Sequence, residues 1–322
     1  SSPCIDAGDP ESDLDPDGSR SDMVAYYYHQ TLGCTNENAT NYDPDANWDD
    51  GSCEYPDNGD YSLNFNGSWD EPHYVNIGRP ISLYAGASAT ISIRFKSTSE
   101  GGYLINNDTS PGNPQFKILV QNDGHLTISG ANEIFDIGGN FNNNQWYELF
   151  VLINEGCVNA YIEDIELESC GHGNMDTGDD FYIGAERSVW DNQAGPFFHG
   201  LIDDVLFWDY AIDDLVNVPQ PSASHYKFNA GDGDILYDHS GNGNHGTING
   251  ATWVENIEGC TDSYAENYNP DANWDDGSCT YPDNGDYSLQ FDGDDDYVRI
   301  DMSDNITQND SYSIAFWFEL GN

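Results

Sequence analysis

Short runs of alternating apolar and polar residues dominate the chain from about residue 61 to residue 213, with Gly, Asn and Asp between them. Successive side chains on a strand point to opposite faces, so this alternation predicts strands with one buried face. Helical periodicity is missing from these runs. The expected strands read, in chain order, YSLNF, HYVNI, ATISIRFKS, YLIN, QFKILVQ, HLTIS, WYELFVLIN, VNAYIE, IELES, FYIGA and GLIDDVLFWDY. Together they predict an all-β fold, an antiparallel sandwich.

Turn residues support the antiparallel arrangement. Asn122-Asp123-Gly124 separates two alternating runs and predicts a hairpin. In CVNAYIEDIELESC, the two cysteines lie symmetrically about Glu163-Asp164. A two-residue turn there would bring the sulfur atoms together, so we expect a disulfide between Cys157 and Cys170.

One long segment occurs twice in nearly identical form, at Gly33–Phe65 and Gly259–Phe291. Each copy has an acidic run between two cysteines and leads into an alternating strand pattern. The cysteine pairs are Cys34 with Cys53 and Cys260 with Cys279. The repetition predicts a modular, array-type protein in which each copy is a small disulfide-linked module.

Oxygen-bearing side chains recur at every second position inside each module. They are Asp43, Asp45, Asn47 and Asp49 in the first copy, and Asn269, Asp271, Asn273 and Asp275 in the second. Calcium prefers several carboxylate and carbonyl oxygens from such short acidic loops. The alternative is an Asp/Asn-rich turn whose side chains cap their own backbone without an ion.

The spacing resembles the opening of an EF-hand calcium loop, but two departures argue against that motif. Trp48 and Trp274 occupy the position where the loop needs glycine, and no Glu follows at the twelfth position. A further D-x-D-x-D-G run is formed near the start of the chain by Asp13, Asp15 and Asp17. We include these three residues among the candidate calcium ligands.

Composition narrows the class of partner. Of 322 residues, 58 are acidic and eight are basic, which gives a formal net charge of −50. Such a surface repels nucleic acid and anionic lipid. Aromatic residues nevertheless make up 13% of the chain and cluster in strand-sized runs, so we expect a folded protein whose self-repulsion is offset by bound calcium or salt. No apolar run reaches the roughly 18 residues of a membrane span.

The seven cysteines indicate an oxidising, extracellular setting. Zinc is the competing interpretation, but the chain has no C-x-x-C pair. Cys4 is left over, as a buried thiol or with a partner outside the chain. The sequence begins with Ser and stops inside a strand pattern, so we expect a processed or excised piece of a longer protein.

Resemblances add to this interpretation. The first 30 residues, with SPCIDAGDP and DPDGSRSDMVAY, resemble the closing rung of secreted parallel β-helix proteins, although Val24 replaces a small residue. WYELFVLIN at Trp146, VNAYIED at Val158 and FHGLIDDVLFW at Phe198 resemble the laminin G-like, concanavalin A-like jelly roll. HYKFNAGDGDILYDHSGNGNHGTINGATW resembles the opening strands of a second such domain. The acidic module is similar to modules in large surface proteins of marine bacteria.

The jelly-roll resemblance implies a carbohydrate- or protein-binding domain, often with one calcium ion at the rim. It implies Asp203 and Asp204 as rim ligands of the first domain and Asp238 as a ligand of the second. The adjacent acids inside the GLIDDV strand also predict a β-bulge, and a bulge that bonds its own backbone is the alternative role for them. Glucanases of this fold carry E-x-D-x-E on one strand, but the nearest match here has the wrong order, so we expect no enzyme activity.

The expected domains are a β-helix-like segment (1–30), module 1 (31–58), a laminin G-like sandwich (59–220), the opening of a second sandwich (221–258), module 2 (259–284) and the incomplete continuation of the second sandwich (285–322). The expected function is calcium-stabilised adhesion or extracellular structure. Subunits would self-associate by β-strand complementation or bind other surface proteins. The alternative is a lectin-like module that binds glycans within a secreted multidomain protein or glycoside hydrolase.

Overall fold

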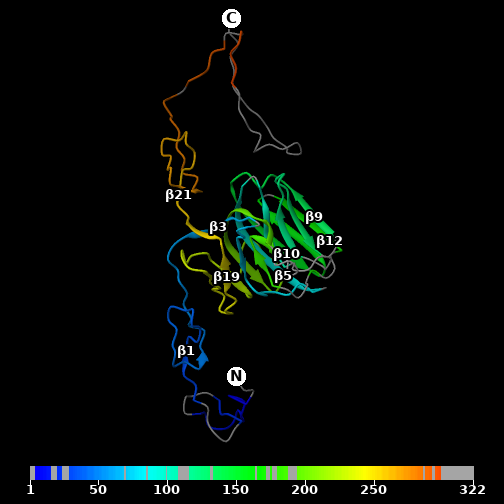
Figure 1. Cartoon of the computed structure of the whole chain (residues 1–322), viewed down its shortest axis with the longest axis vertical. Helices are drawn as coiled ribbons and strands as arrows, with labels where there is room; N and C mark the ends of the chain where they lie inside the picture. The colour runs from blue at the N-terminus through cyan, green and yellow to red at the C-terminus, as the bar shows by residue number, and fades with distance from the viewer. Residues whose placement is uncertain are drawn as a thin grey trace.

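The computed structural model has an elongated shape with one sandwich at its centre (Figure 1). The N-terminal segment and module 1 extend from one side of the sandwich, and module 2 extends from the opposite side. The structure describes residues 4–15, 20–23, 29–68, 70–84, 86–98, 100–107, 116–130, 133–163, 165–171, 175, 180–187, 194–285, 287–291 and 294–298. In this described part no helix is long and apolar enough to cross a membrane.

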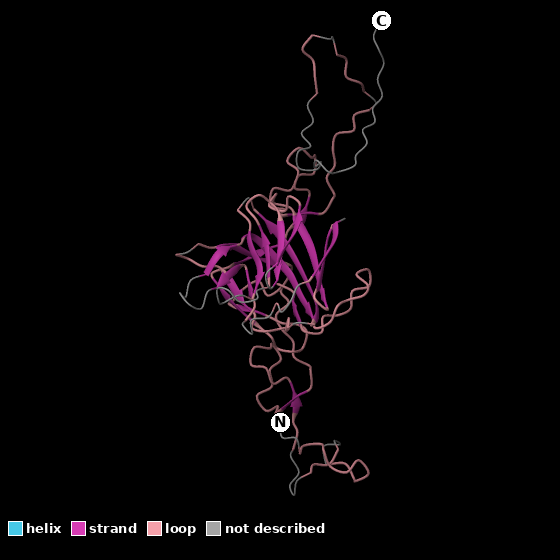
Figure 2. Ribbon diagram, turned by 90° about the vertical axis from the view of Figure 1, so that its right-hand side faces the viewer, coloured by secondary structure: helices cyan, strands magenta, loops and turns pink. Residues whose placement is uncertain are grey.

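Two eight-stranded sheets form the sandwich, and both are antiparallel (Figure 2). The first has the order β12-β11-β10-β5-β16-β3-β20, with β17 paired to β16. Its strands are β3 (Tyr61–Asn66), β5 (Ser88–Ser97), β10 (Trp146–Asn154), β11 (Cys157–Ile162), β12 (Ile165–Cys170), β16 (His199–Trp208), β17 (Ser224–Tyr226) and β20 (Thr252–Glu255).

The second sheet has the order β18-β19-β4-β13-β6-β7-β8-β9. Its strands are β4 (Tyr74–Asn76), β6 (Gly102–Asn106), β7 (Lys117–Val120), β8 (Leu126–Gly130), β9 (Glu133–Gly138), β13 (Tyr182–Ile183), β18 (Ile235–Leu236) and β19 (Gly246–Asn249). Three separate two-stranded pairs complete the described strands. They are β1 (Leu32–Gly33) with β2 (Trp48–Asp49), β14 (Ala185–Arg187) with β15 (Ala194–Phe197), and β21 (Glu258–Gly259) with β22 (Trp274–Asp275).

A single large apolar cluster fills the space between the two sheets. Its largest fully buried side chains include Phe65, Phe95, Phe207 and Tyr226. The cluster arises because the inward positions of each strand are apolar, as in β11, where every second residue is buried. This core confirms the predicted all-β sandwich.

The predicted turns are also present. β7 and β8 form a hairpin around Asn122-Asp123-Gly124. β11 and β12 pair so that Cys157 faces Cys170, and the two form a disulfide. Cys34–Cys53 and Cys260–Cys279 are bonded as well. Edge strand β12 carries exposed Glu166 and Glu168, which discourage pairing with another chain.

One expected domain boundary is wrong. The strands of residues 221–258 belong to the first sandwich and do not open a second one, because β17 pairs with β16, β19 with β4 and β20 with β3. Tyr226, Phe228 and Leu236 from this segment are buried in the same core. An alternating pattern shows that a strand forms but does not show which strand it pairs with. The sandwich therefore runs to Glu255.

The second copy of the strand sequence YSLNF behaves differently from the first. Leu63 and Phe65 in β3 are fully buried between neighbouring strands. Their counterparts Leu289 and Phe291 are 72% and 53% exposed, and residues 287–291 are not a strand. The expected continuation of a second domain over 285–322 lies mostly outside the described residues.

Candidate functional site

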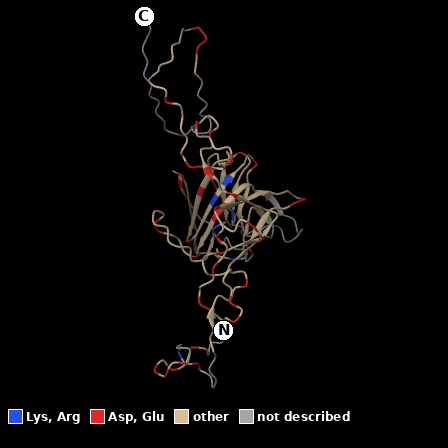
Figure 3. Ribbon diagram, turned by 90° about the vertical axis from the view of Figure 1, so that its left-hand side faces the viewer, with Lys and Arg blue, Asp and Glu red and all other residues tan. Residues whose placement is uncertain are grey.

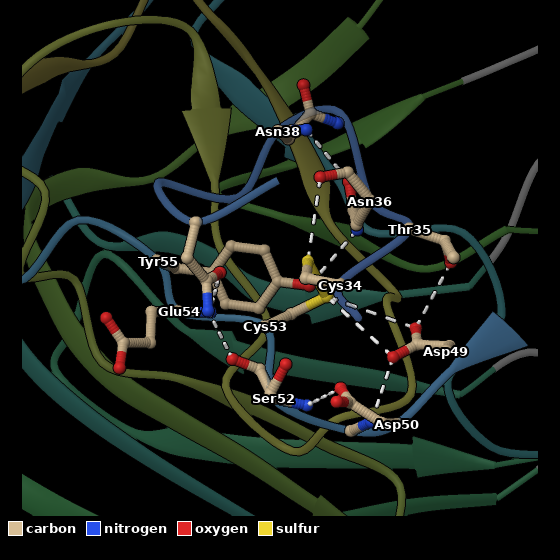
Figure 4. Close-up of a disulfide and its surroundings, with 12 residues drawn as sticks. Cys34, Thr35, Asn36, Asn38, Asp49, Asp50, Ser52, Cys53, Glu54 and Tyr55 are labelled. Atoms are coloured by element: carbon tan, nitrogen blue, oxygen red, sulfur yellow. Dashed lines mark hydrogen bonds between the residues drawn. A yellow bond between two sulfur atoms is a disulfide. The ribbon is translucent and has the colours of Figure 1, made fainter. Parts of the chain in front are cut away.

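The acidic loop of module 1 lies beside the Cys34–Cys53 disulfide (Figure 4). Asp43 accepts a hydrogen bond from the backbone N–H of Asp45, and Asp49 accepts one from Gly51, both at 2.9 Å. A carboxylate that bonds the N–H two residues later is an Asx turn. Each of these carboxylates therefore shapes the local backbone.

Asn47 has a different role, because its amide joins two segments. Its Oδ1 accepts from the N–H of Thr31, and its Nδ2 donates to the carbonyl oxygen of His29. Module 2 repeats the pattern: Asn273 bonds Ile257 and Glu255 in the same way. The amide ties each module to the residues that precede it.

Two other candidate ligands of module 2, Asn269 and Asp275, also form Asx turns. Asn269 accepts from the N–H of Asp271, and Asp275 accepts from that of Gly277, each at 3.1 Å. Within the described residues, the only group of three His, Cys, Asp or Glu side chains with converging ligand atoms is Cys157, Glu168 and Cys170, and its cysteines are disulfide-bonded. The geometry thus supplies the hydrogen bonds of the self-capping alternative, and calcium in these loops stays a prediction.

Asp203 and Asp204 lie at the predicted β-bulge in β16, where the register against β5 shifts and Asp204 has a φ of +40°. The bulge sends the two carboxylates in different directions. Asp203 is 2% exposed and accepts from Asn256 Nδ2 at 3.2 Å, whereas Asp204 forms an ion pair with Arg94 at 3.1 Å. The pair therefore joins a buried hydrogen-bond network to a surface ion pair.

Burial, followed by the negative charge of Asp204, raises the pKa of Asp203 to about 8. The ordinary pKa of an Asp is about 3.9, so between these values folded Asp203 keeps a proton that the unfolded chain has released. Its contribution to stability is complete below pH 4 and falls as the pH rises toward 8. We expect the free energy of unfolding to drop by about 1 kcal/mol between pH 7 and 8.

Urea unfolding in EDTA measures this drop, and the window above pH 7 avoids the titration of the histidines. Asp203→Asn is the control, since it removes the titrating group and should flatten the profile. An equal slope in wild type and Asp203→Asn would contradict the assignment.

Asp238 is fully buried in the loop between β18 and β19. One carboxylate oxygen accepts from the N–H groups of His225 and Ser240, and the other accepts from Ser240 Oγ and the N–H of Asn244, all at 2.9 Å. Four donors fill the lone pairs of this carboxylate. The arrangement fits a residue that organises a loop.

The acidic run near the N-terminus does not form one described cluster. Asp15 accepts a hydrogen bond from the N–H of Asp22 at 3.1 Å, and Asp13 is exposed. Asp17 lies outside the described residues. Cys4 is partly buried and carries a thiol.

Module 2 contacts the sandwich through a tryptophan that the sequence analysis did not single out for binding. The Trp274 ring lies 4.8 Å from the Trp146 ring, and the Arg94 guanidinium lies 4.2 Å from the Trp274 ring centre. Lys96 Nζ donates to the carbonyl oxygen of Asn273 at 3.0 Å. We call Arg94, Lys96 and Trp146 the docking patch.

The register of two neighbouring strands assembles this patch. Arg94 and Lys96 are two residues apart on β5 and so share one face. Lys96 lies directly opposite Trp146 on β10. The ion pair with Asp204 restrains Arg94 at the tryptophan, and burial lowers the pKa of Lys96. Non-neighbouring parts of the chain thus combine into one aromatic and cationic surface.

Module 1 contacts the opposite side of the same sandwich through Tyr55. The Tyr55 ring stacks on Tyr237 with 5.6 Å between centroids and meets the edge of His245 at 4.6 Å. Asn36 Nδ2 lies 2.8 Å from His245 Nε2. Burial raises the pKa of Tyr55 and lowers that of His245.

Backbone bonds and a charge pair strengthen this second junction. Asn58 donates through its N–H to Asn229 O at 2.8 Å and through its side chain to Ala230 O at 2.6 Å. Lys227 lies 3.9 Å from Asp57. Three of the eight basic residues, Arg94, Lys96 and Lys227, therefore contact a module. Figure 3 shows Asp and Glu throughout the described chain and Lys and Arg mostly on the sandwich.

A pocket of about 480 Å³ opens between module 1 and the sandwich. Its lining residues are Gly51, Cys53, Glu54, Tyr55, Asp57, His239, Ser240 and Gly241. His239 Nε2 is buried and has no hydrogen-bond partner among the residues that the structure describes, and burial lowers the pKa of His239 to about 4. The pocket thus combines an aromatic ring, two carboxylates and a neutral imidazole.

The sequence analysis missed both sets of docking residues. The signal that could have found them is the repetition of a tryptophan and a tyrosine in each module, Trp48 and Tyr55, then Trp274 and Tyr281. A large aromatic ring that recurs in two polar surface loops indicates that the ring packs against another part of the protein. The partners on the sandwich could not have been found, because they come from distant strands.

Residues 70–214 match the family model of the concanavalin A-like lectin/glucanases superfamily, Laminin_G_3. No curated protein matches the sequence. Similar solved structures include a native heptameric SAP-like pentraxin from Limulus polyphemus, with 20% identity and a TM-score of 0.36 over 48% of this chain and 77% of that chain.

Two other similar structures come from a mammal and a bacterium. Domains LG4-5 of the mouse laminin alpha1 chain have 14% identity and a TM-score of 0.37, over 48% of this chain and 44% of that one. The CBM40 of a Ruminococcus gnavus sialidase, bound to sialyllactose, has 16% identity and a TM-score of 0.34, over 40% and 80%. The sandwich of this chain therefore has an antiparallel, jelly-roll-type all-β fold, and its residues 70–214 are similar to the laminin G-like, concanavalin A-like superfamily.

Proposed function

We propose that this chain is a calcium-stabilised extracellular structural or adhesive protein, in which the two modules are stiff joints that hold jelly-roll domains in a row. The three disulfides suit an extracellular setting. The two modules leave the sandwich from opposite sides (Figure 1). Modules docked in this way would fix the orientation of each domain relative to the next one in the row.

The observation that carries the proposal is the contact of Trp274 with the docking patch. A flexible linker made of Asp, Asn and Gly has no fixed contacts with its neighbours. The Trp274 indole instead contacts both a guanidinium and a second indole on the sandwich. Asn256 adds a bond at the same joint, since it donates to Asp60 Oδ1 at 2.8 Å and accepts from Ser62 Oγ at 3.0 Å. The joint is therefore fixed on both sides of the module's first residues.

Calcium is the part of the proposal that rests on charge. Asp43 and Asp49 each use one carboxylate oxygen in an Asx turn, and each module loop is rich in further exposed acids. Bound cations would offset repulsion within a chain of net charge −50. Direct ligation by such oxygens is typical of calcium.

We expect millimolar calcium to protect the module amides from hydrogen exchange about tenfold more than EGTA does, as a local stabilisation of about 1.4 kcal/mol. Magnesium at equal concentration is the matched control for charge screening. Asp43→Asn with Asp49→Asn should remove the calcium effect in module 1 and leave it in module 2. Identical exchange in calcium and EGTA would contradict calcium binding by the loops.

Self-association is supported by the segment Tyr287–Phe291. It repeats the β3 sequence pattern but leaves Leu289 and Phe291 exposed. An exposed strand-like apolar segment is available to pair with the edge of another sheet. Light scattering of the calcium-loaded chain tests this: assemblies support it, and a monodisperse monomer at high concentration counts against it.

A second candidate function is glycan binding, which the pocket beside Tyr55 favours. Aromatic faces stack on sugar rings, and Glu54 and Asp57 offer acceptors for hydroxyl groups. A glycan screen distinguishes the two functions. Binding that Tyr55→Phe retains and Glu54→Ala abolishes would favour a lectin, whereas no binding together with a stiff, extended particle would favour the joint.

A further inference from the structure

The two modules share several internal hydrogen bonds, so their backbones have the same framework. The N–H of Asp43 donates to Cys34 O, and that of Asn269 donates to Cys260 O, both at 2.9 Å. Asn41 Nδ2 donates to Ser52 O at 2.6 Å, and its counterpart Asn267 makes the same bond in module 2 at 2.7 Å. A contact made by one module can therefore be transferred to the other.

Each module uses only one of its two aromatic faces on the sandwich. Module 2 contacts the docking patch through Trp274, whereas Tyr281 is 55% exposed. Module 1 contacts the sandwich through Tyr55, the counterpart of Tyr281. The face that carries Trp48 does not take part in that contact.

Trp48 begins β2, which pairs with β1. β1 lies at the end of module 1 that is remote from the sandwich (Figure 1). In module 2 the equivalent pair, β21–β22, lies next to the sandwich (Figure 1). Within the described part of the chain, the Trp48 side chain is half-buried and makes no ring contact or hydrogen bond.

We propose that the Trp48 face of module 1 is a docking surface for a second β-sandwich unit that presents an arginine, a lysine and an indole in the arrangement of the docking patch. The inference rests on the proposed joint function. The contact of Trp274 defines the chemistry: a guanidinium over one indole face, a second indole against the ring and an ammonium at the preceding carbonyl oxygen. Asn47-Trp48 repeats Asn273-Trp274 and offers that carbonyl oxygen and that ring.

The chain itself supplies the probe for this surface. Trp274→Ala vacates the docking patch on its own sandwich, so the immobilised Trp274→Ala chain offers an open patch. In the wild-type chain in solution, Trp274 already occupies the docking patch. This chain can therefore bind the immobilised open patch only through Trp48. We expect wild-type chain to bind that surface at least about tenfold more tightly than Trp48→Ala does, because the variant lacks the ring that would stack on the indole and face the guanidinium.

A second immobilised variant keeps the proposal testable even if Trp48→Ala does not fold. Arg94→Gln combined with Trp274→Ala removes the guanidinium and should weaken wild-type binding to the level of Trp48→Ala. Equal binding of wild type and Trp48→Ala, or no binding at millimolar chain, overturns the inference. The proposed function fails separately, if Trp274→Ala leaves module 2 as firmly docked as before.

Discussion

Replacing Cys34 and Cys53 together by alanine is expected to unfold module 1 while the sandwich stays folded. The module has almost no core of its own, since Cys34 and Ala39 are its only buried apolar residues among those described. A disulfide that spans 19 residues constrains the unfolded chain by about 3 kcal/mol. Units this small generally depend on such a link.

Hydrogen exchange followed by mass spectrometry checks this prediction. Amides at residues 34–55 should lose protection, and amides in β5 and β10 should keep it. The matched control is Cys157→Ala with Cys170→Ala. This change should loosen the β11–β12 hairpin only slightly and leave the rest of the chain unchanged, because the backbone hydrogen bonds between the two strands remain. If the Cys34→Ala, Cys53→Ala chain kept its protection from exchange, the loops of module 1 would be stable without the disulfide, and the prediction would be wrong.

Replacing Trp274 by alanine is expected to release module 2 from the sandwich. The variant loses the stack on Trp146 and the cation contact with Arg94, each worth about 1 kcal/mol. The bonds that remain at this joint are the one from Lys96 to Asn273 O and those of Asn256 with Asp60 and Ser62. The docked fraction should fall by about 30-fold relative to the undocked fraction.

Small-angle X-ray scattering detects the release. Wild-type data should fit one elongated particle, and Trp274→Ala data should need several orientations of module 2. Trp48→Ala is the matched control, because it removes the same residue from the same loop at a place where the sandwich is not contacted. Identical curves for wild type and Trp274→Ala would show that the tryptophan does not fix the joint.

The strands of the sandwich could be predicted from the sequence because the patterns that specify them span only a few neighbouring residues. Alternation, turn residues and cysteine spacing each act over a few residues, and together they gave most strands of the sandwich, the hairpin at Asn122-Asp123-Gly124 and all three disulfides. The missed strands β9 and β15 lack this clear alternation. The bulge at Asp203 and Asp204 was also predictable, since two adjacent acids interrupt the strand period.

Strand partnership could not be read from the sequence. YSLNF and YSLQF differ at one position, yet the first is buried in β3 and the second is exposed. The difference comes from β16 and β20, which flank β3 and satisfy its backbone. For the same reason, residues 221–258 were assigned to the wrong domain: their strand pattern contained no information about β3, β4 and β16.

The candidate site was only partly predictable. Alternating oxygen side chains predicted calcium sites in the module loops, and this stays a prediction; the hydrogen bonds by which Asp43 and Asp49 shape turns fit the self-capping alternative. Asp238 was predicted as a ligand, which stays untested; its carboxylate accepts four hydrogen bonds that no local pattern indicates. The docking contacts join residues about 130 to 180 positions apart in the chain, such as Trp146 with Trp274 and Lys96 with Asn273, so no local pattern identifies them.

The most direct test of the joint is the backbone 15N relaxation of the wild-type chain. A docked module tumbles with the sandwich, so amides of both modules and of β5 should share one rotational correlation time. That result supports stiff joints held by Tyr55 and Trp274. Clearly shorter correlation times for the module amides than for the sandwich would mean that the modules move freely, and would contradict the account.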